Sequence, residues 1–257
     1  MLEVRDLGIR FGGHTAVDAV SCQFAAGSLT AIVGPNGAGK TTFFNLISGQ
    51  LKASTGSVWL NGQDLSGLGV SARTHAGLGR AFQLTNLFPN LSVLENVRLA
   101  VQATQDGAHR RGLNLWSIWS DHHALSDSAH ALLHEVSLQD KAHQPVSSLP
   151  HGDQRKLEVA LLMALKPQVY MFDEPTAGMS ADEAPVILEL IRRLKADRSK
   201  IILLVEHKMN VVRELADRII VLHNGQLVAD GEPTEVMASP IVQEAYLGRS
   251  QPSQVAA

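Results

Sequence analysis

The chain has 257 residues, of which 45% are hydrophobic, and a formal net charge of −3. This length allows one large domain, or one domain with a subdomain, and the apolar content is enough for a full core. The slightly negative charge argues against a nucleic acid as the main partner. Because Cys22 is the only cysteine, no internal disulfide can form, which fits a reducing compartment.

The sequence pattern predicts neither a signal peptide nor a membrane-spanning helix. Residues 1–6 alternate like a strand and lack the apolar core of a signal peptide. The longest apolar stretches, 159–165 and 201–205, are far shorter than the ~20 residues that a membrane-spanning helix needs. We therefore expect a soluble chain, for which any work at a membrane goes through a partner.

The first third of the chain predicts strands followed by a glycine-rich loop. Residues 1–33 have the pattern of several β-strands, with turns at Gly12-Gly13 and Ala26-Gly27. The last strand, 29–33, leads into residues 34–42, Gly-Pro-Asn-Gly-Ala-Gly-Lys-Thr-Thr, a complete phosphate-loop motif. A helix is predicted from Thr41 to Ser48, ended by Gly49.

The glycine-rich loop has the chemistry of a polyphosphate site. Its glycines let successive backbone N–H groups point at phosphate oxygens, Lys40 can reach the β- and γ-phosphates, and the Thr41 hydroxyl can bind Mg²⁺. The N-terminus of the following helix adds partial positive charge. We predict a binding site for a nucleoside triphosphate, formed by Asn36, Gly37, Ala38, Gly39, Lys40, Thr41 and Thr42.

The remaining elements predict the fold class. Within 57–65, Asn61-Gly62 predicts a β-hairpin, and the helical periodicity of 92–140 predicts a helical insertion. Strands and helices then alternate, which favours a parallel sheet covered by helices: strand 169–172, a helix near 186–195, strand 201–205, a helix near 209–216, and a hairpin at 219–228 over Asn224-Gly225.

We therefore expect an α/β protein with a phosphate-loop NTPase core, a mainly parallel sheet, an antiparallel β layer and a helical subdomain. A single domain is expected over 1–248, with its helical subdomain at roughly 87–165. Residues 249–257 are expected to be a loose tail.

Asp173 and Glu174 follow the apolar strand 169–172, which we expect beside the strand of the phosphate loop. An acidic residue at this end of a strand is placed to bind Mg²⁺, and we assign that role to Asp173. Glu174 can then polarise an attacking water. The plain alternative is a solvated turn before Pro175.

Two further residues are candidates for the same site. His207 follows the strand 201–205, which should run parallel to the others, so its imidazole can bind a γ-phosphate oxygen. Gln83 follows Phe82 after a turn-rich stretch, and its amide can touch Mg²⁺ or the attacking water. Each is also compatible with an ordinary surface residue.

In this order the motifs resemble the ATPase subunit of ATP-binding cassette (ABC) transporters, over residues 1–248. The resemblance is carried by Phe11, the phosphate loop, Gln83, a signature at 149–154, Asp173-Glu174, the turn 177–180 and His207. Finer features are similar to the ATPases of branched-chain amino acid importers, or of related urea or amide importers: Phe11-Gly12-Gly13, Arg-Ala-Phe-Gln at 80–83, Leu-Phe-Pro at 87–89, the insertion after Val101, and Ala-Tyr-Leu-Gly at 245–248.

The resemblance implies roles for these residues. Phe11 would stack on adenine with Val17 packing nearby, and ATP and Mg²⁺ would be the cofactors. Two cassettes would close head to tail, with each ATP between one subunit's phosphate loop and the other's signature. The further implied partners are permease subunits and, indirectly, a periplasmic solute-binding protein, at the cytoplasmic face of the membrane.

The signature departs from the family pattern. The usual Leu-Ser-Gly-Gly-Gln reads here as Leu149, Pro150, His151, Gly152 and Asp153. The serine hydroxyl that donates to the γ-phosphate is missing, and proline has neither a hydroxyl nor an N–H. His151 or the Gly152 N–H can substitute, because an apolar-rich helix predicted at 155–165 places the signature at a helix N-terminus. The later turn ends at Ser180, where many cassettes have aspartate.

Other functions stay open as alternatives. The nearest is the ATPase of a lipid or lipopolysaccharide exporter, against which the insertion at 102–125 and residues 87–89 favour an importer. A soluble cassette ATPase of DNA repair or translation would need coiled coils, a second cassette or a basic face. A nucleotide kinase would leave Glu174 and His207 without a role.

Two groups of side chains outside these motifs also suggest sites. His122, His123, His130 and His134 suggest a metal site, but no cysteine or carboxylate pattern completes one. Trp116 and Trp119 are candidates for a partner-docking face or for the core of the subdomain.

Overall fold

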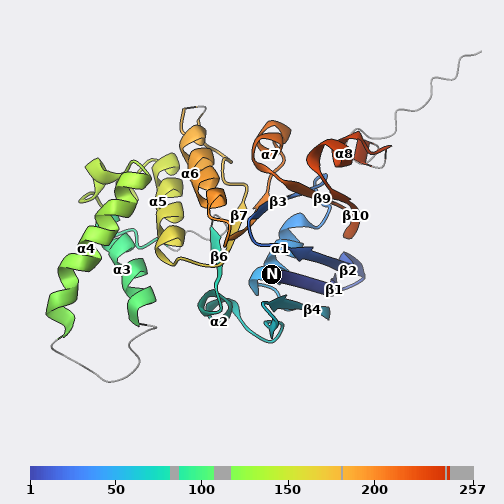
Figure 1. The fold of residues 1–257 in the computed structure, drawn as a ribbon, viewed down its shortest axis with the longest axis horizontal. Coiled ribbons are helices and arrows are strands. Elements are labelled where there is room, and N and C mark those ends of the chain that lie inside the picture. Colours follow the sequence, from blue (N-terminus) through green and yellow to red (C-terminus); the bar gives the residue numbers. More distant parts are fainter. Residues whose placement is uncertain (82–86, 107–116, 181, 241, 244–257) are drawn as a thin grey trace, which may run out of the picture. The chain divides into compact units, whose positions relative to one another are not determined.

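The structure is a computed structural model that describes residues 1–81, 87–106, 117–180, 182–240 and 242–243. The chain forms two compact units (Figure 1). Unit 1 comprises Met1–Ala76 and Ile201–Ala257, and unit 2 comprises Gly77–Lys200. Unit 2 is therefore one continuous insertion into the sequence of unit 1.

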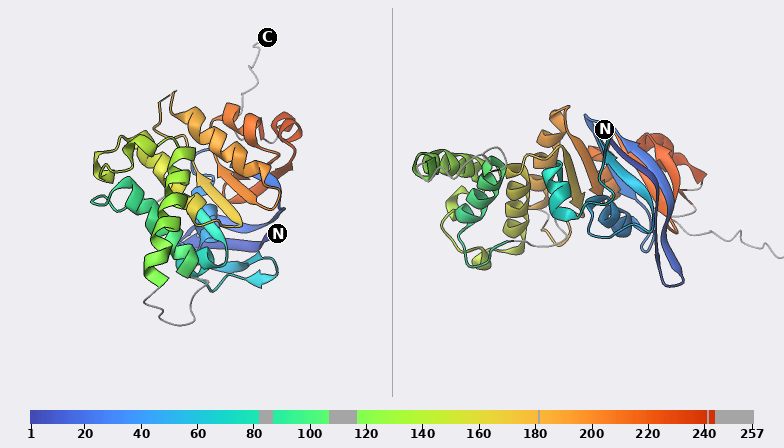
Figure 2. Two further views of the ribbon diagram at one scale, coloured as in Figure 1. Left: turned by 60° about the vertical axis from the view of Figure 1, so that its left-hand side comes forward. Right: turned by 90° about the horizontal axis from the view of Figure 1, so that it is seen from below.

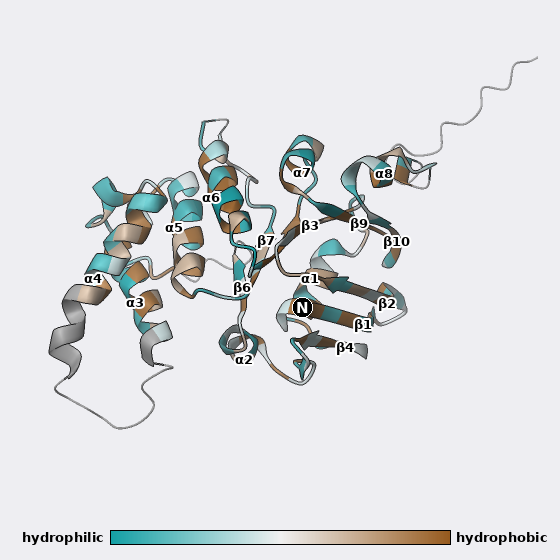
Figure 3. Ribbon diagram, viewed as in Figure 1, coloured by the Kyte–Doolittle hydropathy of each residue, from teal (hydrophilic) through white to brown (hydrophobic). Residues whose placement is uncertain are grey.

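Unit 1 contains an antiparallel sheet in the order β2-β1-β4-β5. Its strands alternate polar and apolar residues (Figure 3), so that one face is buried. The turns predicted at Gly12-Gly13 and Asn61-Gly62 are confirmed, because each joins two adjacent strands. The strands are β1 (Leu2–Phe11), β2 (His14–Phe24), β4 (Thr55–Leu60) and β5 (Gln63–Asp64).

Unit 1 also contains parallel strands around β3 (Ser28–Val33). This strand pairs in parallel with β8 (Ile201–Val205) on one edge and β9 (Arg218–His223) on the other, and β10 (Gln226–Gly231) pairs antiparallel with β9. The predicted strand 201–205 and the hairpin over Asn224-Gly225 are thus confirmed. The expectation that the strand before Asp173 lies directly beside β3 is wrong, because β8 and β9 take the hydrogen bonds of both edges of β3.

The helices of unit 1 are α1 (Lys40–Ser48), α2 (Val70–His75), α7 (Met209–Leu215) and α8 (Pro233–Ala238). Helix α1 ends at Ser48 and is capped by Gly49, as predicted, with φ 82° at the glycine. Helices α2 and α8 were not predicted. Arg73 anchors α2, because its Nη1 donates to the carbonyl oxygens of Leu46 and Ile47 at the end of α1.

Unit 2 pairs β6 (Leu78–Ala81) in parallel with β7 (Val169–Asp173) and is otherwise helical. Helices α3, α4 and α5 lie beside one another in both views of Figure 2, and α5 also packs on β6 and α6. The helical periodicity of 92–140 is confirmed by α3 and α4. The elements are α3 (Val93–Asp106), α4 (Ser117–Glu135), η1 (Gln139–Lys141), η2 (Val146–Ser148), α5 (His151–Ala164) and α6 (Ala184–Ala196).

Candidate functional site

The glycine-rich loop of unit 1 joins β3 to α1 and packs directly on neighbouring backbone. A Cβ atom at Gly34 would lie 2.2 Å from the carbonyl oxygen of Leu222, and one at Gly39 would lie 2.4 Å from that of Ala16. Both glycines also have positive φ angles, 154° and 95°. Since side chains are excluded at both positions, the close turn requires glycine.

Lys40 places a cation inside this loop. It is the first residue of α1 and is buried, and its Nζ donates to the carbonyl oxygens of Gly34 (2.7 Å) and Pro35 (2.9 Å). Asn36, Gly37 and Thr41 are exposed around it. A buried ammonium, a helix N-terminus and an exposed rim of backbone form the donor set that a polyphosphate requires.

The turn between β9 and β10 is hydrogen-bonded to the phosphate loop. The Gly225 N–H donates to the carbonyl oxygen of Ala38 (3.0 Å), and the carbonyl oxygen of Gly225 accepts from the Asp18 N–H on β2 (2.8 Å). The phosphate loop is therefore fixed by backbone contacts as well as by Lys40.

Of the two residues that the resemblance places near adenine, Phe11 is exposed and Val17 is buried. Phe11 ends β1, lies opposite His14 in the turn, and has 49% of its surface exposed. Its ring can therefore stack on a base. Val17 is fully buried in the sheet, and its packing near the adenine stays a prediction.

His207 lies at the same edge of the parallel strands as the phosphate loop. It follows strand β8, which runs parallel to β3 and has Val205 paired with Ile32, two residues before the loop begins at Gly34. Its side chain is half exposed, and its backbone N–H donates to the buried carboxylate of Glu206 (2.8 Å). The sequence interpretation did not single out Glu206.

In unit 2, Asp173 is held by a residue that sequence reasoning did not assign to the site. Arg80 on β6 donates from Nη2 to Oδ2 of Asp173 at 2.7 Å, and both side chains are almost fully buried. Burial lowers the pKa of the Arg80 guanidinium, and the Asp173 carboxylate acts in the opposite direction. Glu174 follows with φ 50°, a conformation that is uncommon for a residue other than glycine.

The signature lies at the start of α5, which begins at His151 rather than at the predicted residue 155. Pro150 is the N-cap and provides no side-chain hydrogen bond. Gly152 is buried against Glu183, whose Oε1 would lie 2.1 Å from a Cβ at this position. The sequence interpretation missed Glu183, which is the N-cap residue of α6 and whose Oε2 accepts from both the N–H and the Oγ of Ser180 (3.1 Å).

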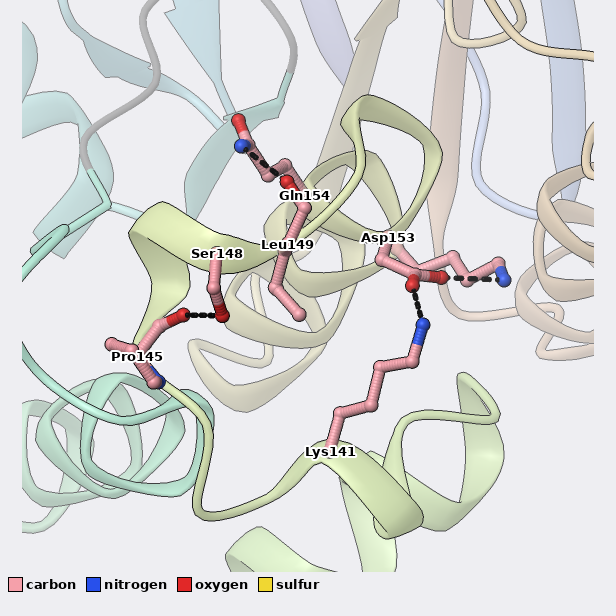
Figure 4. A network of polar contacts seen from close by, with 7 residues as sticks. Lys141, Pro145, Ser148, Leu149, Asp153 and Gln154 are labelled. Atoms are coloured by element: carbon pink, nitrogen blue, oxygen red, sulfur yellow. Dashed lines mark hydrogen bonds and ion pairs between the residues drawn. The ribbon is translucent and has the colours of Figure 1, made fainter.

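Asp153, the acidic residue in the signature, is neutralised by two lysines (Figure 4). Its carboxylate accepts hydrogen bonds from Nζ of Lys141 and from Nζ of Lys156, the latter at 2.9 Å. Burial acts to raise the pKa of Asp153, but the two lysine hydrogen bonds outweigh it and hold that pKa below its usual value. The next residue, Gln154, donates to the carbonyl oxygen of Leu149 (3.0 Å).

Several predicted residues lie outside the described part of the structure. These are Gln83, Trp116, residues 245–248 and the tail 249–257, and the side chains of Trp119, His122 and His123. Within the described residues, no group of three or more His, Cys, Asp or Glu side chains is placed to hold a metal ion. Within the same part of the chain, no helix combines the length and the hydropathy needed to cross a membrane.

A phosphate loop between β3 and α1, flanked by parallel strands, defines unit 1 as a phosphate-loop nucleotide-binding unit. Residues 17–177 match the family model described as "ABC transporter". Residues 226–251 match a second model, described as "Branched-chain amino acid ATP-binding cassette transporter". The chain belongs to the ABC transporter family, as one of its ATP-binding cassettes.

Characterised relatives agree with this assignment along almost the whole chain. The chain is 36% identical over 251 residues to the high-affinity branched-chain amino acid transport ATP-binding protein LivG of Escherichia coli K12, covering 97% of this chain and 98% of that protein. It is 34% identical over 252 residues to BraF of Pseudomonas aeruginosa, which has the same description, with the same coverage.

The crystal structure of a nucleotide-free ATP-binding cassette from an ABC transporter superposes with a TM-score of 0.80 at 27% sequence identity. The match covers 97% of this chain and 99% of the other. The fold class predicted from the sequence is thereby confirmed.

Proposed function

We propose that this chain is the ATP-hydrolysing subunit of an importer of branched-chain amino acids. The observation that carries the proposal is the phosphate loop with its buried Lys40 and exposed rim. The similarity to LivG and BraF along nearly the whole chain supports an importer rather than a lipid exporter.

The residues of unit 1 bind and orient the nucleotide. Phe11 stacks on adenine, the backbone N–H groups of 36–42 surround the phosphates, and Lys40 exchanges its carbonyl partners for the β- and γ-phosphate oxygens. His207 donates to a γ-phosphate oxygen. Glu174, from unit 2, accepts a proton from the attacking water.

The donor set also suits Mg²⁺, which prefers oxygen ligands. Thr41 supplies an exposed hydroxyl at the start of α1, Asp173 supplies a carboxylate and Gln83 an amide oxygen. When bound, Mg²⁺ neutralises phosphate charge and fixes the phosphate geometry.

The signature of this chain is proposed to serve a second cassette. The N-terminus of α5 favours a γ-phosphate, and the lysine pair removes the repulsion that Asp153 would otherwise cause. In such a dimer, ATP binding closes the two cassettes and hydrolysis reopens them. The movement acts on permease subunits at the cytoplasmic face of the membrane, and a periplasmic solute-binding protein delivers the solute.

Reconstitution tests this proposal. The chain, its partner cassette and the permease subunits are placed in liposomes with the solute-binding protein, and ATP-dependent uptake of radiolabelled leucine is measured. Wild-type protein is expected to take up leucine, and Lys40→Ala to lose both ATP binding and uptake. ATP-dependent movement of a lipid with no leucine uptake would overturn the proposal.

The permease is proposed to dock on unit 2, near the start of α3. Single cysteines at Leu87 and Leu99 are expected to cross-link to the permease, whereas Val101 is too buried to serve. Native Cys22 does not interfere, because burial raises the pKa of its thiol to about 12. A cysteine at exposed Gln226 on the β9–β10 hairpin is the control. Cross-linking only at residue 226 would contradict this docking site.

A further inference from the structure

The first turn of α5, which carries the signature, has no side-chain cap. Its N-cap residue is Pro150, which makes no side-chain hydrogen bond. The first backbone bond of the helix runs from the Gln154 N–H to the carbonyl oxygen of Pro150 (3.0 Å). The N–H groups of residues 151–153 precede this bond, so the helix itself provides no acceptor for them. This end of α5 therefore carries partial positive charge, which favours an anion nearby.

The carboxylate of Glu183 lies beside this turn. A Cβ atom at Gly152 would be 2.1 Å from Oε1 of Glu183 and 2.5 Å from Oε2, so the carboxylate packs directly on the glycine. Because the Cα–Cβ bond of a helical residue is tilted toward the N-terminus of its helix, the carboxylate lies on the N-terminal side of Gly152. The glycine of the signature thus makes room for an anion that belongs to the same chain.

Ser180, in the turn before α6, holds Glu183 in this place. The N–H and the Oγ of Ser180 both donate to Oε2 of Glu183, each at 3.1 Å. An aspartate at position 180, which many cassettes have, is an acceptor when ionised and would repel the carboxylate. The serine at this position therefore allows Glu183 to stay beside the signature.

The charge of Glu183 is not neutralised as that of Asp153 is. Asp153 is paired with Lys141 and Lys156. Among the described residues, no lysine or arginine forms an ion pair with Glu183, and the hydrogen bonds from Ser180 leave its negative charge in place. Since like charges repel, the charge that stabilises the free end of α5 also opposes a second anion there.

We propose that Glu183 takes the place of a phosphate at the start of α5 in the free cassette, and thereby sets the affinity of the signature for the γ-phosphate of a partner's ATP. Its charge stabilises the uncapped helix end until the two cassettes close, and it weakens the binding of the γ-phosphate when they do. This inference rests on the proposed function, because it concerns the signature that serves the second cassette.

Glu183→Gln removes the charge and keeps the shape of the side chain. The thermal midpoint of the nucleotide-free cassette is expected to fall by roughly 1–4 °C, because α5 loses a favourable charge at its N-terminus. The dissociation constant of the dimer in Mg²⁺ and ATP is expected to fall roughly twofold to tenfold, because the γ-phosphate no longer meets a like charge. Sedimentation measures this constant in a Glu174→Gln background, which preserves the ATP. A merely structural role of Glu183 would weaken both the fold and the dimer.

The matched control is Glu95→Gln on α3. Oε2 of Glu95 also accepts from the N–H (2.8 Å) and the Oγ (2.7 Å) of a serine three residues earlier, Ser92, but at a different helix. This variant is expected to lower the thermal midpoint without changing the dissociation constant of the dimer. A second variant, Glu183→Lys, reverses the charge and should tighten the dimer further than Glu183→Gln. Both gains should shrink as the salt concentration rises, since salt screens the repulsion.

The outcomes separate this inference from the proposed function. Weaker or unchanged association in both Glu183 variants would overturn the inference alone, provided that the chain with Glu183 intact forms a dimer in ATP. An equal gain in ADP would also overturn it, because ADP has no γ-phosphate. If the chain with Glu183 intact associates in ATP neither with itself nor with a partner cassette, the dimer of the proposed function fails together with the inference.

Discussion

The guanidinium of Arg80 donates a 2.7 Å hydrogen bond to the carboxylate of Asp173, the residue that we propose as a ligand of Mg²⁺. The side chains are 8% and 10% exposed, so solvent cannot replace either partner. Arg80 thus provides a buried counter-charge that fixes this carboxylate in position at the end of β7.

Arg80→Ala is therefore expected to destabilise the protein strongly. Removing one partner of a buried ion pair costs about 3–5 kcal/mol, because the other charge stays buried. The control is Arg192→Ala, which breaks an exposed pair with Glu189 and should cost less than about 1 kcal/mol. Urea unfolding of the two variants provides the comparison. Equal, small losses of unfolding free energy in both variants would mean that the buried Arg80–Asp173 pair stabilises the protein no more than the exposed pair does.

Glu174→Gln is expected to keep ATP binding while slowing hydrolysis by roughly 10²–10⁴, the contribution of a positioned general base. The residue follows the Mg²⁺ candidate directly and has a strained backbone, with φ 50°, that is typical of a functional position. Nucleotide affinity is measured by titration with a fluorescent ATP analogue and turnover by phosphate release. Glu189→Gln is the exposed control. Turnover close to that of the wild type at the same Mg²⁺ and ATP would exclude Glu174 from this role.

Local patterns made much of the fold predictable, whereas contacts between distant residues did not. The strands around the phosphate loop are continuous apolar runs, and Asn-Gly pairs mark two hairpins. The short helix α2 has no such pattern, because Arg73 fixes it by bonds to the end of α1. Arg80 and Asp173 are 93 positions apart, and no periodicity joins them.

In the candidate site, too, local motifs were predictable from the sequence and contacts between distant residues were not. The phosphate loop, Asp173 and His207 were predicted from motifs, because the chemistry proposed for them requires certain residue types at fixed spacing. Glu183 and the lysines that hold Asp153 could not be found in this way, since their roles depend on packing between helices. The start of α5 was predicted too late, because polar residues at 151–154 obscured the first turn.

The Asp153 carboxylate is expected to stabilise the protein in a pH-dependent way. Its folded-state pKa is lowered, so its contribution is fully present above the unfolded value near 4 and is lost as the pH falls through the folded value. Asp153→Asn should therefore lower the thermal midpoint at pH 7, and the difference from the wild type should shrink below about pH 4.

The measurement is calorimetry at pH 7, 5 and 3, with Lys141→Met and Lys156→Met as partner variants. Each lysine variant should show a smaller loss than Asp153→Asn, because the other lysine remains bonded to the carboxylate. A difference between wild type and Asp153→Asn that is the same at every pH would contradict the role of ionisation.

Pro150→Ser is expected to change hydrolysis more than stability. A serine at the N-cap of α5 can accept a hydrogen bond from the first turn, worth about 0.5–2 kcal/mol, while loss of proline frees the unfolded chain by about 0.4–1 kcal/mol. The thermal midpoint should therefore change little. The new hydroxyl can also donate to a γ-phosphate bound by a partner cassette, a contribution of at most roughly 10²–10³ in rate.

The test compares two assemblies, because the signature of this chain is proposed to act on the partner's ATP. In a homodimer both sites gain the hydroxyl, so turnover should rise clearly. In a heterodimer with a second cassette, only the ATP bound to that cassette should be hydrolysed faster. Replacing the phosphate-loop lysine in one subunit at a time shows which of the two bound ATP molecules is hydrolysed. Pro233→Ser, at the start of α8, is the control for replacing a proline at a helix start. If neither assembly is accelerated, His151 or the backbone N–H groups at the start of α5 already supply the missing donor, and the departure of the signature at Pro150 has no catalytic cost.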